Sequence, residues 1–151
     1  MAMTMQLDEI DYKILKILVR DSRMSYREIA KKLELAVGTV ASRIRQLEAN
    51  GVIKGYTIVL DHEKLGYGIT TVTELTVAGG KLLEVDKVIS KIPNVCCVYD
   101  VTGEIDSIVI SKFRTREELS QFTKKILSIP HVERTNTHVV LTTIKEDFRL
   151  I

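Results

Sequence analysis

The sequence predicts an α+β protein in which a three-helix domain is followed by a domain of βαββαβ order. Two observations carry this prediction. In the first 50 residues, apolar side chains recur at helical spacing in three successive segments. In the last 90 residues, runs rich in valine, isoleucine and threonine alternate with two apolar helical segments, each of which ends before a proline. The composition, 45% apolar and 28% charged, is typical of soluble globular proteins.

The first predicted helix spans residues 8–20, and Asp8 has a side chain that can cap its first turn. A second, short helix begins after Ser25. Ser25 and Glu28 have the spacing of a capping box, in which each side chain accepts a hydrogen bond from the other residue's backbone amide. A tight turn over 34–36 separates this helix from the next. The apolar positions of the two helices are Ile10, Ile14, Leu15, Ile17, Leu18, Ile29, Ala30 and Leu33.

A third helix is predicted over 37–50, before Gly51, a residue that readily takes the left-handed conformation at a helix C-terminus. Its non-apolar face is small and polar at the N-terminal end and basic further along. Such a face suits a helix in the major groove of DNA, because small residues permit close approach and arginines reach phosphates. Three short helices with a tight turn also form purely structural bundles, so spacing alone leaves both interpretations open. The apolar stripe holds Val37, Val40, Ile44 and Leu47, and the opposite face holds Gly38, Thr39, Ala41, Ser42, Arg45 and Gln46.

Positive charge is concentrated in this helical region. Residues 20–54 contain eight Lys and Arg against four Asp and Glu, whereas residues 62–151 contain twelve of each. The imbalance is a modest electrostatic footprint for a polyanion, although charged helix faces are more often simply solvated. We expect basic side chains to contact phosphates, hydroxyl groups to bond base edges, and Val37 and Ala41 to contact thymine methyl groups. The residues expected to contact DNA are Arg27, Val37, Gly38, Thr39, Ala41, Ser42, Arg43, Arg45 and Lys54.

An extended segment over 52–60 links the three helices to the second predicted domain. That domain has the order of a split ferredoxin-like sandwich, in which helices cover one face of an antiparallel sheet. Its elements are a strand over 69–77, a helix from Leu82 to the residue before Pro93, strands over 95–101 and 105–113 joined by a hairpin at 102–104, a helix opened by a Thr115–Glu118 capping box and ended before Pro130, and a strand over 132–144.

The second face of this sheet has no element of the chain left to cover it. Residues 139–144 place apolar side chains on both faces of the predicted last strand. Exposed apolar faces of this size are unusual in monomers. We therefore expect a homodimer that forms face to face.

A set of short motifs runs along nearly the whole chain: Leu7–Asp11, Ile14–Leu15, Ile29–Ala30, Val40, Arg43, Leu47–Glu48, Gly51–Tyr56 and Leu65–Tyr67. In these motifs the chain resembles the Lrp/AsnC regulators, also called feast/famine regulatory proteins. The resemblance implies a winged helix-turn-helix followed by an ACT-like sensing domain, and a homodimer that often assembles into an octamer. It also implies transcription regulation by sequence-specific binding to palindromic DNA, with two recognition helices in successive major grooves and with a small effector, usually an amino acid.

Two residues shape the expected recognition helix. The family commonly has serine or threonine where this chain has Ala36, so the usual side-chain cap is missing, at a cost of about 0.5–2 kcal/mol. Gly38 inside the helix costs about 1 kcal/mol relative to alanine. We expect a helix that is partly ordered by DNA itself, with DNA shape and bending contributing to specificity.

The resemblance also places the effector near the hairpin. An amino acid needs a carboxylate for its ammonium group, which Asp106 or Glu104 would provide, and hydroxyl or backbone amide groups for its own carboxylate. A plain turn with a hydrogen-bonded aspartate explains this motif equally well. The residues expected to bind the effector are Thr102, Gly103, Glu104, Asp106, Thr135 and Thr137.

The expected domains are 1–51 for DNA binding, 52–66 as a linking strand and hinge, and 67–151 for ligand sensing and oligomerisation. No cofactor or metal is expected, because the three histidines have no ligand spacing with the adjacent pair Cys96 and Cys97, which we expect to be free thiols. No apolar run is long enough to span a membrane, so we expect a cytoplasmic protein without a membrane partner.

Two other functions stay open. A siroheme decarboxylase has a similar two-domain build, but an enzyme needs titratable groups gathered in a pocket, and this chain offers three scattered histidines and no nucleophile with an obvious base. An architectural protein would bind DNA with nearly the same affinity at any sequence, whereas a specific regulator discriminates by a factor of about 10³ or more.

Overall fold

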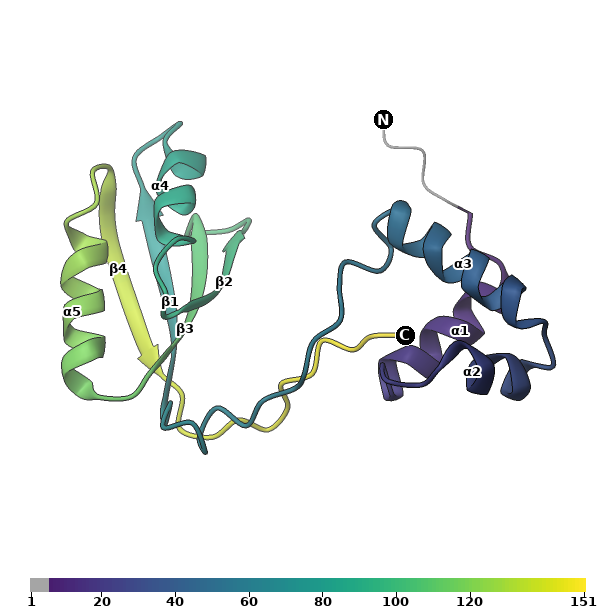
Figure 1. Ribbon diagram of the computed structural model, residues 1–151. Helices are drawn as coiled ribbons and strands as arrows, with labels where there is room; N and C mark the ends of the chain where they lie inside the picture. The colour runs from purple at the N-terminus through teal and green to yellow at the C-terminus, as the bar shows by residue number, and fades with distance from the viewer. Residues whose placement is uncertain (1–5) are drawn as a thin grey trace. The chain divides into compact units, whose positions relative to one another are not determined.

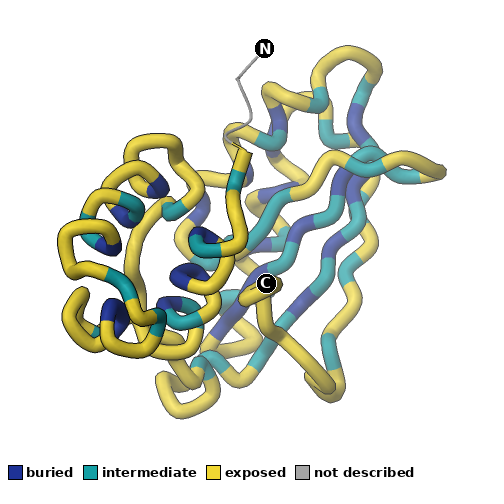
Figure 2. Tube along the Cα trace, turned by 90° about the vertical axis from the view of Figure 1, so that its right-hand side faces the viewer, coloured by how far each residue is buried: buried dark blue, intermediate teal, exposed yellow. Residues whose placement is uncertain are grey.

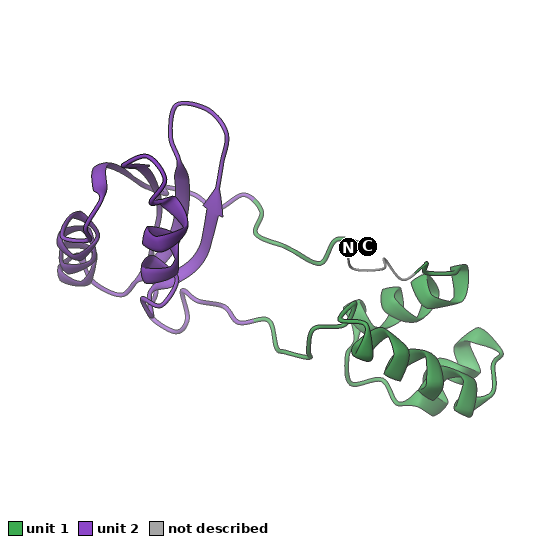
Figure 3. Ribbon diagram, turned by 90° about the horizontal axis from the view of Figure 1, so that it is seen from above, with its two compact units in different colours: residues 1–59, 145–151 green, residues 60–144 purple. Residues whose placement is uncertain are grey.

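The computed structural model describes residues 6–151 and divides the chain into two compact units (Figure 3). The first unit runs to Val59 and also includes residues 145–151, and the second spans Leu60–Ile144. The C-terminal segment thus groups with the first unit, whereas the sequence predicted one domain over 67–151. Arg149 and Ile151 line a cavity of about 400 Å³ together with side chains of the first helix. These residues are far apart in sequence, so no local pattern could predict that they lie together.

The first unit contains the three predicted helices, α1 (Glu9–Arg20), α2 (Tyr26–Leu33) and α3 (Val37–Ala49) (Figure 1). The predicted caps are confirmed. The Asp8 side chain accepts a hydrogen bond from the Asp11 amide, and the Asp11 side chain accepts one from the Asp8 amide. Ser25 and Glu28 form the predicted capping box at α2. Each cap satisfies amides that the first helical turn leaves without a partner.

The three helices enclose one apolar core. Ile14 of α1, Ile29 of α2, and Val40, Ile44 and Leu47 of α3 are all 0% exposed. Figure 2 shows buried positions recurring along the helices of this unit. Each such side chain contributes about 1.5–3 kcal/mol relative to an exposed position, so burial of this stripe fixes which face of α3 points outward.

The second unit has the predicted βαββαβ order. Its four strands form one antiparallel sheet with the order β2-β3-β1-β4. The elements are β1 (Ile69–Val77), α4 (Leu82–Ile89), β2 (Val95–Asp100), β3 (Ser107–Phe113), α5 (Arg116–Leu127) and β4 (Val132–Val139). The α+β fold class and the ferredoxin-like topology are therefore confirmed.

Both helices of this unit pack on the same face of the sheet. Val85 and Ile89 of α4 share one core with Phe122 and Ile126 of α5, and Leu75 of β1 lies in the same cluster. Burial alternates along the strands, as the buried and half-buried positions of Figure 2 show. The other face of the sheet is uncovered within residues 6–151.

The uncovered sheet face combines an apolar centre with a polar edge. Strand register places Val72 beside Ile110 on one side and His138 on the other. Glu74 accepts a 3.0 Å hydrogen bond from Asn136 Nδ2, and His138 Nε2 lies 3.5 Å from Glu74 Oε2. The half-exposed or partly buried apolar side chains of this face are Val72, Tyr99, Ile108 and Ile110.

Three sequence predictions about this region are wrong. Residues 52–60 form no strand, because no described strand accepts their backbone hydrogen bonds. The last strand ends at Val139 and not at 144, since β1 begins at Ile69 and leaves little chain opposite it; Leu141 is 96% exposed. Thr115 caps α5, but Glu118 accepts from the Arg114 amide, so the capping box is not reciprocal.

Candidate nucleic-acid interface

Helices α2 and α3 are joined by the tight turn that the sequence predicted. Glu34 ends α2 in the left-handed conformation, with φ of 55°, and the Leu35 amide donates to the Ala30 carbonyl. This turn changes the direction of the chain within residues 34–36, and α3 begins at Val37. Ala36 precedes it as the cap residue without any side-chain hydrogen bond, as predicted.

Helix α3 presents one face to solvent along its whole length. Its buried stripe holds it against α1 and α2, so the remaining side chains must face outward. Gly38 has open space where a Cβ would lie, which leaves room for a close approach at the start of the helix. The exposed residues of this face are Val37, Gly38, Thr39, Ser42, Arg45 and Gln46, and Ala41 is half-buried beside them.

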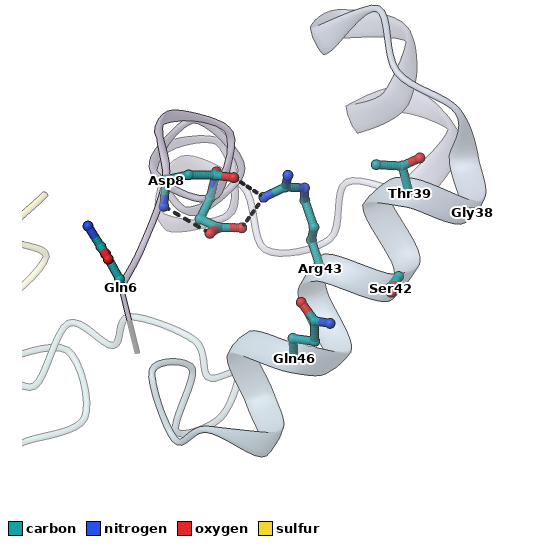
Figure 4. Close-up of a pocket in the computed structure, with 8 residues that line it drawn as sticks. Gln6, Asp8, Gly38, Thr39, Ser42, Arg43 and Gln46 are labelled. Carbon is teal, nitrogen blue, oxygen red and sulfur yellow. Dashed lines mark hydrogen bonds and ion pairs between the residues drawn. The ribbon is translucent and has the colours of Figure 1, made fainter. Parts of the chain in front are cut away.

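A shallow groove of about 610 Å³ runs along this face (Figure 4). Thr39, Ser42 and Gln46 bring two hydroxyl groups and one amide to it, and these are the groups that hydrogen-bond base edges. Sequence reasoning placed Gln46 on the outward face but not among the DNA contacts. Its spacing of four residues from Ser42 was the signal that could have added it. Gln6, which precedes α1, also lines the groove and had no such signal.

Arg43, predicted to contact phosphate, is already bound within the protein. Its Nη1 donates to Asp8 Oδ2 over 2.7 Å and to Asp11 Oδ1 over 2.9 Å (Figure 4). The side chain of Arg43 is only 25% exposed and that of Asp11 only 5%. This arginine therefore joins α3 to the start of α1. These two bonds occupy Nη1 and restrain the position from which the guanidinium could reach a phosphate.

The charges of this cluster stabilise one another. The hydrogen bond from the Asp11 amide, and then that from the Arg43 side chain, lower the pKa of Asp8. Hydrogen bonds to Asp8 and then Asp11 raise the pKa of Arg43 above its already high usual value. At neutral pH the cluster thus holds a permanent cation between carboxylates.

The other predicted phosphate contacts are accessible. Arg27 on α2, Arg45 on α3 and Lys54 after α3 are exposed, and none of them forms an ion pair within residues 6–151. Unpaired surface cations are the groups that replace counterions on a nucleic-acid backbone. Phosphate binding by Arg27, Arg45 and Lys54 stays a prediction, and Arg43 differs from them because it is already paired.

The predicted effector residues fall into two groups that the fold separates. Thr102, Gly103 and Glu104 are exposed in the β2–β3 connection, where Gly103 has a φ of 126° that favours glycine. Thr135 and Thr137 lie on β4, and β1 runs between β4 and β3.

Asp106 has a backbone partner in the structure. Its Oδ2 accepts a 2.8 Å hydrogen bond from the Val77 amide, and its own amide donates to the Leu75 carbonyl. The Thr137 hydroxyl lies 3.2 Å from that of Thr73. Several polar groups assigned to the effector thus have intramolecular partners, which a ligand would have to share or replace.

Three other features are absent from the part of the chain that the structure describes. None of its helices is long and apolar enough to cross a membrane. Within the same residues, no group of three or more His, Cys, Asp or Glu side chains is placed to hold a metal ion. Cys96 and Cys97 form no disulfide.

A buried stripe and an outward polar face on the helix after a tight turn define a helix-turn-helix DNA-binding protein that carries a second, ferredoxin-like domain. Comparison with known proteins gives the same division. Residues 7–54 match the family model of winged helix-turn-helix DNA-binding domains, and residues 70–150 match that of the Lrp/AsnC ligand binding domain. The chain belongs to the Lrp/AsnC family of helix-turn-helix transcription regulators.

Relatives and solved structures resemble the chain over nearly its full length. An HTH-type transcriptional regulator of Pyrococcus furiosus is 54% identical over 97% of this chain and 99% of its own. The structure of Bacillus subtilis LrpC has a TM-score of 0.83 at 33% identity, covering 95% of this chain and 100% of its own. A regulator from Neisseria meningitidis, solved as a complex with L-Met, has a TM-score of 0.87 at 26% identity and 97% coverage of both chains.

Proposed function

We propose that the chain is a homodimeric, sequence-specific transcription regulator whose two α3 helices enter successive major grooves of a palindromic DNA site. The observation that carries this proposal is the exposed face of α3. Thr39, Ser42 and Gln46 line one groove, next to the close approach that Gly38 permits, while Val40, Ile44 and Leu47 on the opposite side of the helix are fully buried. A structural bundle also has a polar outer face, but it does not require hydroxyl and amide groups gathered in a groove beside a glycine.

Phosphate binding is assigned to the exposed cations around this face. Arg27, Arg45 and Lys54 come from three different segments of the first unit, so together they would fix the orientation of α3 on the duplex. Their contribution is independent of sequence and falls with salt. The discrimination between sequences is assigned to the hydroxyl and amide groups of the groove and to DNA shape.

Dimer formation is assigned to the uncovered sheet face. Val72, Ile108, Ile110 and Tyr99 form its apolar centre, and burying them against a second copy removes them from water. A two-fold axis relating two α3 helices requires half-sites about one helical turn, roughly 34 Å, apart. The family resemblance extends this assembly to an octamer of four dimers.

An amino acid is proposed as the effector. The match to a ligand binding domain and the L-Met complex of the Neisseria meningitidis relative support this choice. The carboxylates of Glu104 and Asp106 suit the ammonium group, and the hydroxyl and amide groups of Thr102 and Gly103 suit the carboxylate. Thr135 and Thr137 lie on β4, on the far side of β1, so they would serve a larger or second part of the effector. Regulation and not catalysis is the activity proposed, as the names of the relatives support.

The decisive experiment selects bound fragments from a random DNA pool, with and without each amino acid. We expect enrichment of a palindrome and binding at least about 10³ times tighter than to random DNA. Ser42→Ala combined with Gln46→Ala lowers this ratio, whereas Arg116→Ala, an exposed cation of the second unit, leaves it unchanged. Equal affinity for selected and random DNA would identify an architectural protein instead.

A further inference from the structure

The Arg43 cluster lies at the edge of the groove that is proposed to read DNA. Arg43 lines the groove with Ser42 on one side in the sequence and with Gln46 one helical turn later. A free arginine at this place would be well positioned for a phosphate. Instead, both hydrogen bonds given above, at 2.7 and 2.9 Å, tie its Nη1 to Asp8 and Asp11.

The two carboxylates of the cluster are themselves held in place. Asp8 and Asp11 accept hydrogen bonds from each other's backbone amides in the capping box of α1. Asp11 is only 4% exposed, so its side chain is held by the residues packed around it. Arg43 therefore faces a rigid acceptor, and two carboxylates against one guanidinium give the cluster a formal charge of −1. A negative cluster beside α3 repels phosphate.

We propose that Asp8 and Asp11 hold Arg43 back from DNA phosphates, so that this cluster limits the sequence-independent affinity of the protein for DNA. The inference rests on the proposed binding of DNA through α3. A phosphate contact strengthens binding to every sequence about equally, so an arginine released at the edge of the groove would raise the affinity for random and selected DNA alike. Arg43 is then a positioning residue, which orients α3 against α1, and the two aspartates limit non-specific binding.

The salt dependence of binding distinguishes a withheld arginine from one that contacts phosphate. Each phosphate contact contributes about 0.9 to the slope of log affinity against log salt concentration. The measurement compares Arg43→Gln with Arg45→Gln, an exposed arginine on the same helix, on one random-sequence duplex. We expect the slope to fall by about 0.9 in Arg45→Gln and to stay at the wild-type value in Arg43→Gln. Equal losses of slope in the two variants would overturn the proposal.

The converse experiment releases Arg43 from its exposed partner. Asp8→Asn keeps an oxygen for the Asp11 amide and a residue type that caps helices well, while it removes the charge. We expect random-DNA affinity to rise by up to roughly tenfold near 0.1 M salt and the slope to steepen by up to about 0.9. Affinity for the selected site should rise by a similar factor, because a phosphate contact does not depend on sequence.

Two further variants assign this gain to Arg43. Glu9→Gln removes the same charge one residue later, from a side chain that is 82% exposed and pairs only with Lys13. It is the matched control and should change random binding little. In Asp8→Asn combined with Arg43→Gln, the gain should disappear. A gain that persists in the double variant, or one that Glu9→Gln reproduces, contradicts the proposal.

The experiment needs separate controls for the folding of the variants and for the proposed function. Helical circular dichroism of each variant at the assay temperature identifies loss of structure, and Asp8→Asn tests the proposal even where Arg43→Gln unfolds the first unit. If the wild-type protein shows no salt-dependent binding to any duplex, the proposed function fails. If it binds and discriminates but Arg43→Gln loses slope as Arg45→Gln does, only the inference about Arg43 fails.

Discussion

The Tyr56 hydroxyl donates a 2.9 Å hydrogen bond to Glu48 Oε1, which joins the chain after α3 to the last turn of that helix. Burial, followed by the hydrogen bond to Glu48, raises the pKa of Tyr56 to about 12. This contact is the anchor of a segment that otherwise forms no secondary structure over residues 54–60.

The raised pKa of Tyr56 predicts a loss of stability in alkali. The folded protein favours the protonated phenol, so the contribution is fully present below the ordinary tyrosine pKa of about 10 and is lost as the pH rises through the folded value near 12. The difference in tyrosinate absorbance between wild type and Tyr56→Phe should titrate near 12. Tyr12→Phe, which removes an exposed tyrosine of the same unit, provides the comparison. If the difference between wild type and Tyr56→Phe titrated near the ordinary tyrosine value of about 10, the assignment would be contradicted.

Adding the missing cap of α3 should stabilise the first unit. Ala36 has φ of −69° and ψ of 142°, the extended conformation in which a serine hydroxyl accepts from the helix amides. We expect Ala36→Ser to raise the free energy of unfolding by about 0.5–2 kcal/mol in urea titrations. Ala49→Ser, at the exposed other end of the same helix, gains no cap and should not stabilise. A stabilisation shared by both variants would rule out capping as its cause.

Local features of this fold were predictable, because their partners lie close in sequence. Ser25 and Glu28 are three residues apart, and the capping box formed as expected. The bond from Arg43 to Asp8 spans 35 positions, and no periodicity links the two residues. The sequence pattern correctly predicted that Arg43 lies on α3. It did not predict the two aspartates that bind Arg43, so the accessibility of this charge was overestimated.

Alternating segments form strands only where another strand lies beside them. Residues 69–77 alternate, and β1 forms between β3 and β4. Residues 52–60 and 140–144 alternate as well, but neither segment pairs as a strand within residues 6–151. The apolar face that argued for a dimer was therefore assigned to the wrong residues. It lies at Val72, Ile108 and Ile110 in the centre of the sheet.

A charge at the centre of the uncovered sheet face should prevent dimer formation. Ile110 lies beside Val72 on β1 and opposite Cys97 on β2, so Ile110→Lys would bury a cation without a partner in any face-to-face dimer. We expect a monomer by analytical ultracentrifugation. Leu83→Lys, on an exposed position of the helical layer, should remain dimeric. A dimer in Ile110→Lys with the wild-type dissociation constant would place the interface elsewhere.

Asp106 can be tested separately as an effector ligand and as a structural residue. Its Oδ2 accepts from the Val77 amide, and Asp106→Asn keeps an oxygen there while it removes the charge that an ammonium group needs. Asp106→Ala leaves the amide without this partner and should cost about 1–3 kcal/mol in urea unfolding. If Asp106 binds the effector, isothermal titration with the twenty amino acids finds a ligand of the wild type that Asp106→Asn no longer binds at unchanged stability. Full binding by Asp106→Asn would assign the carboxylate to the turn alone, because the hydrogen bond to Val77 survives in that variant.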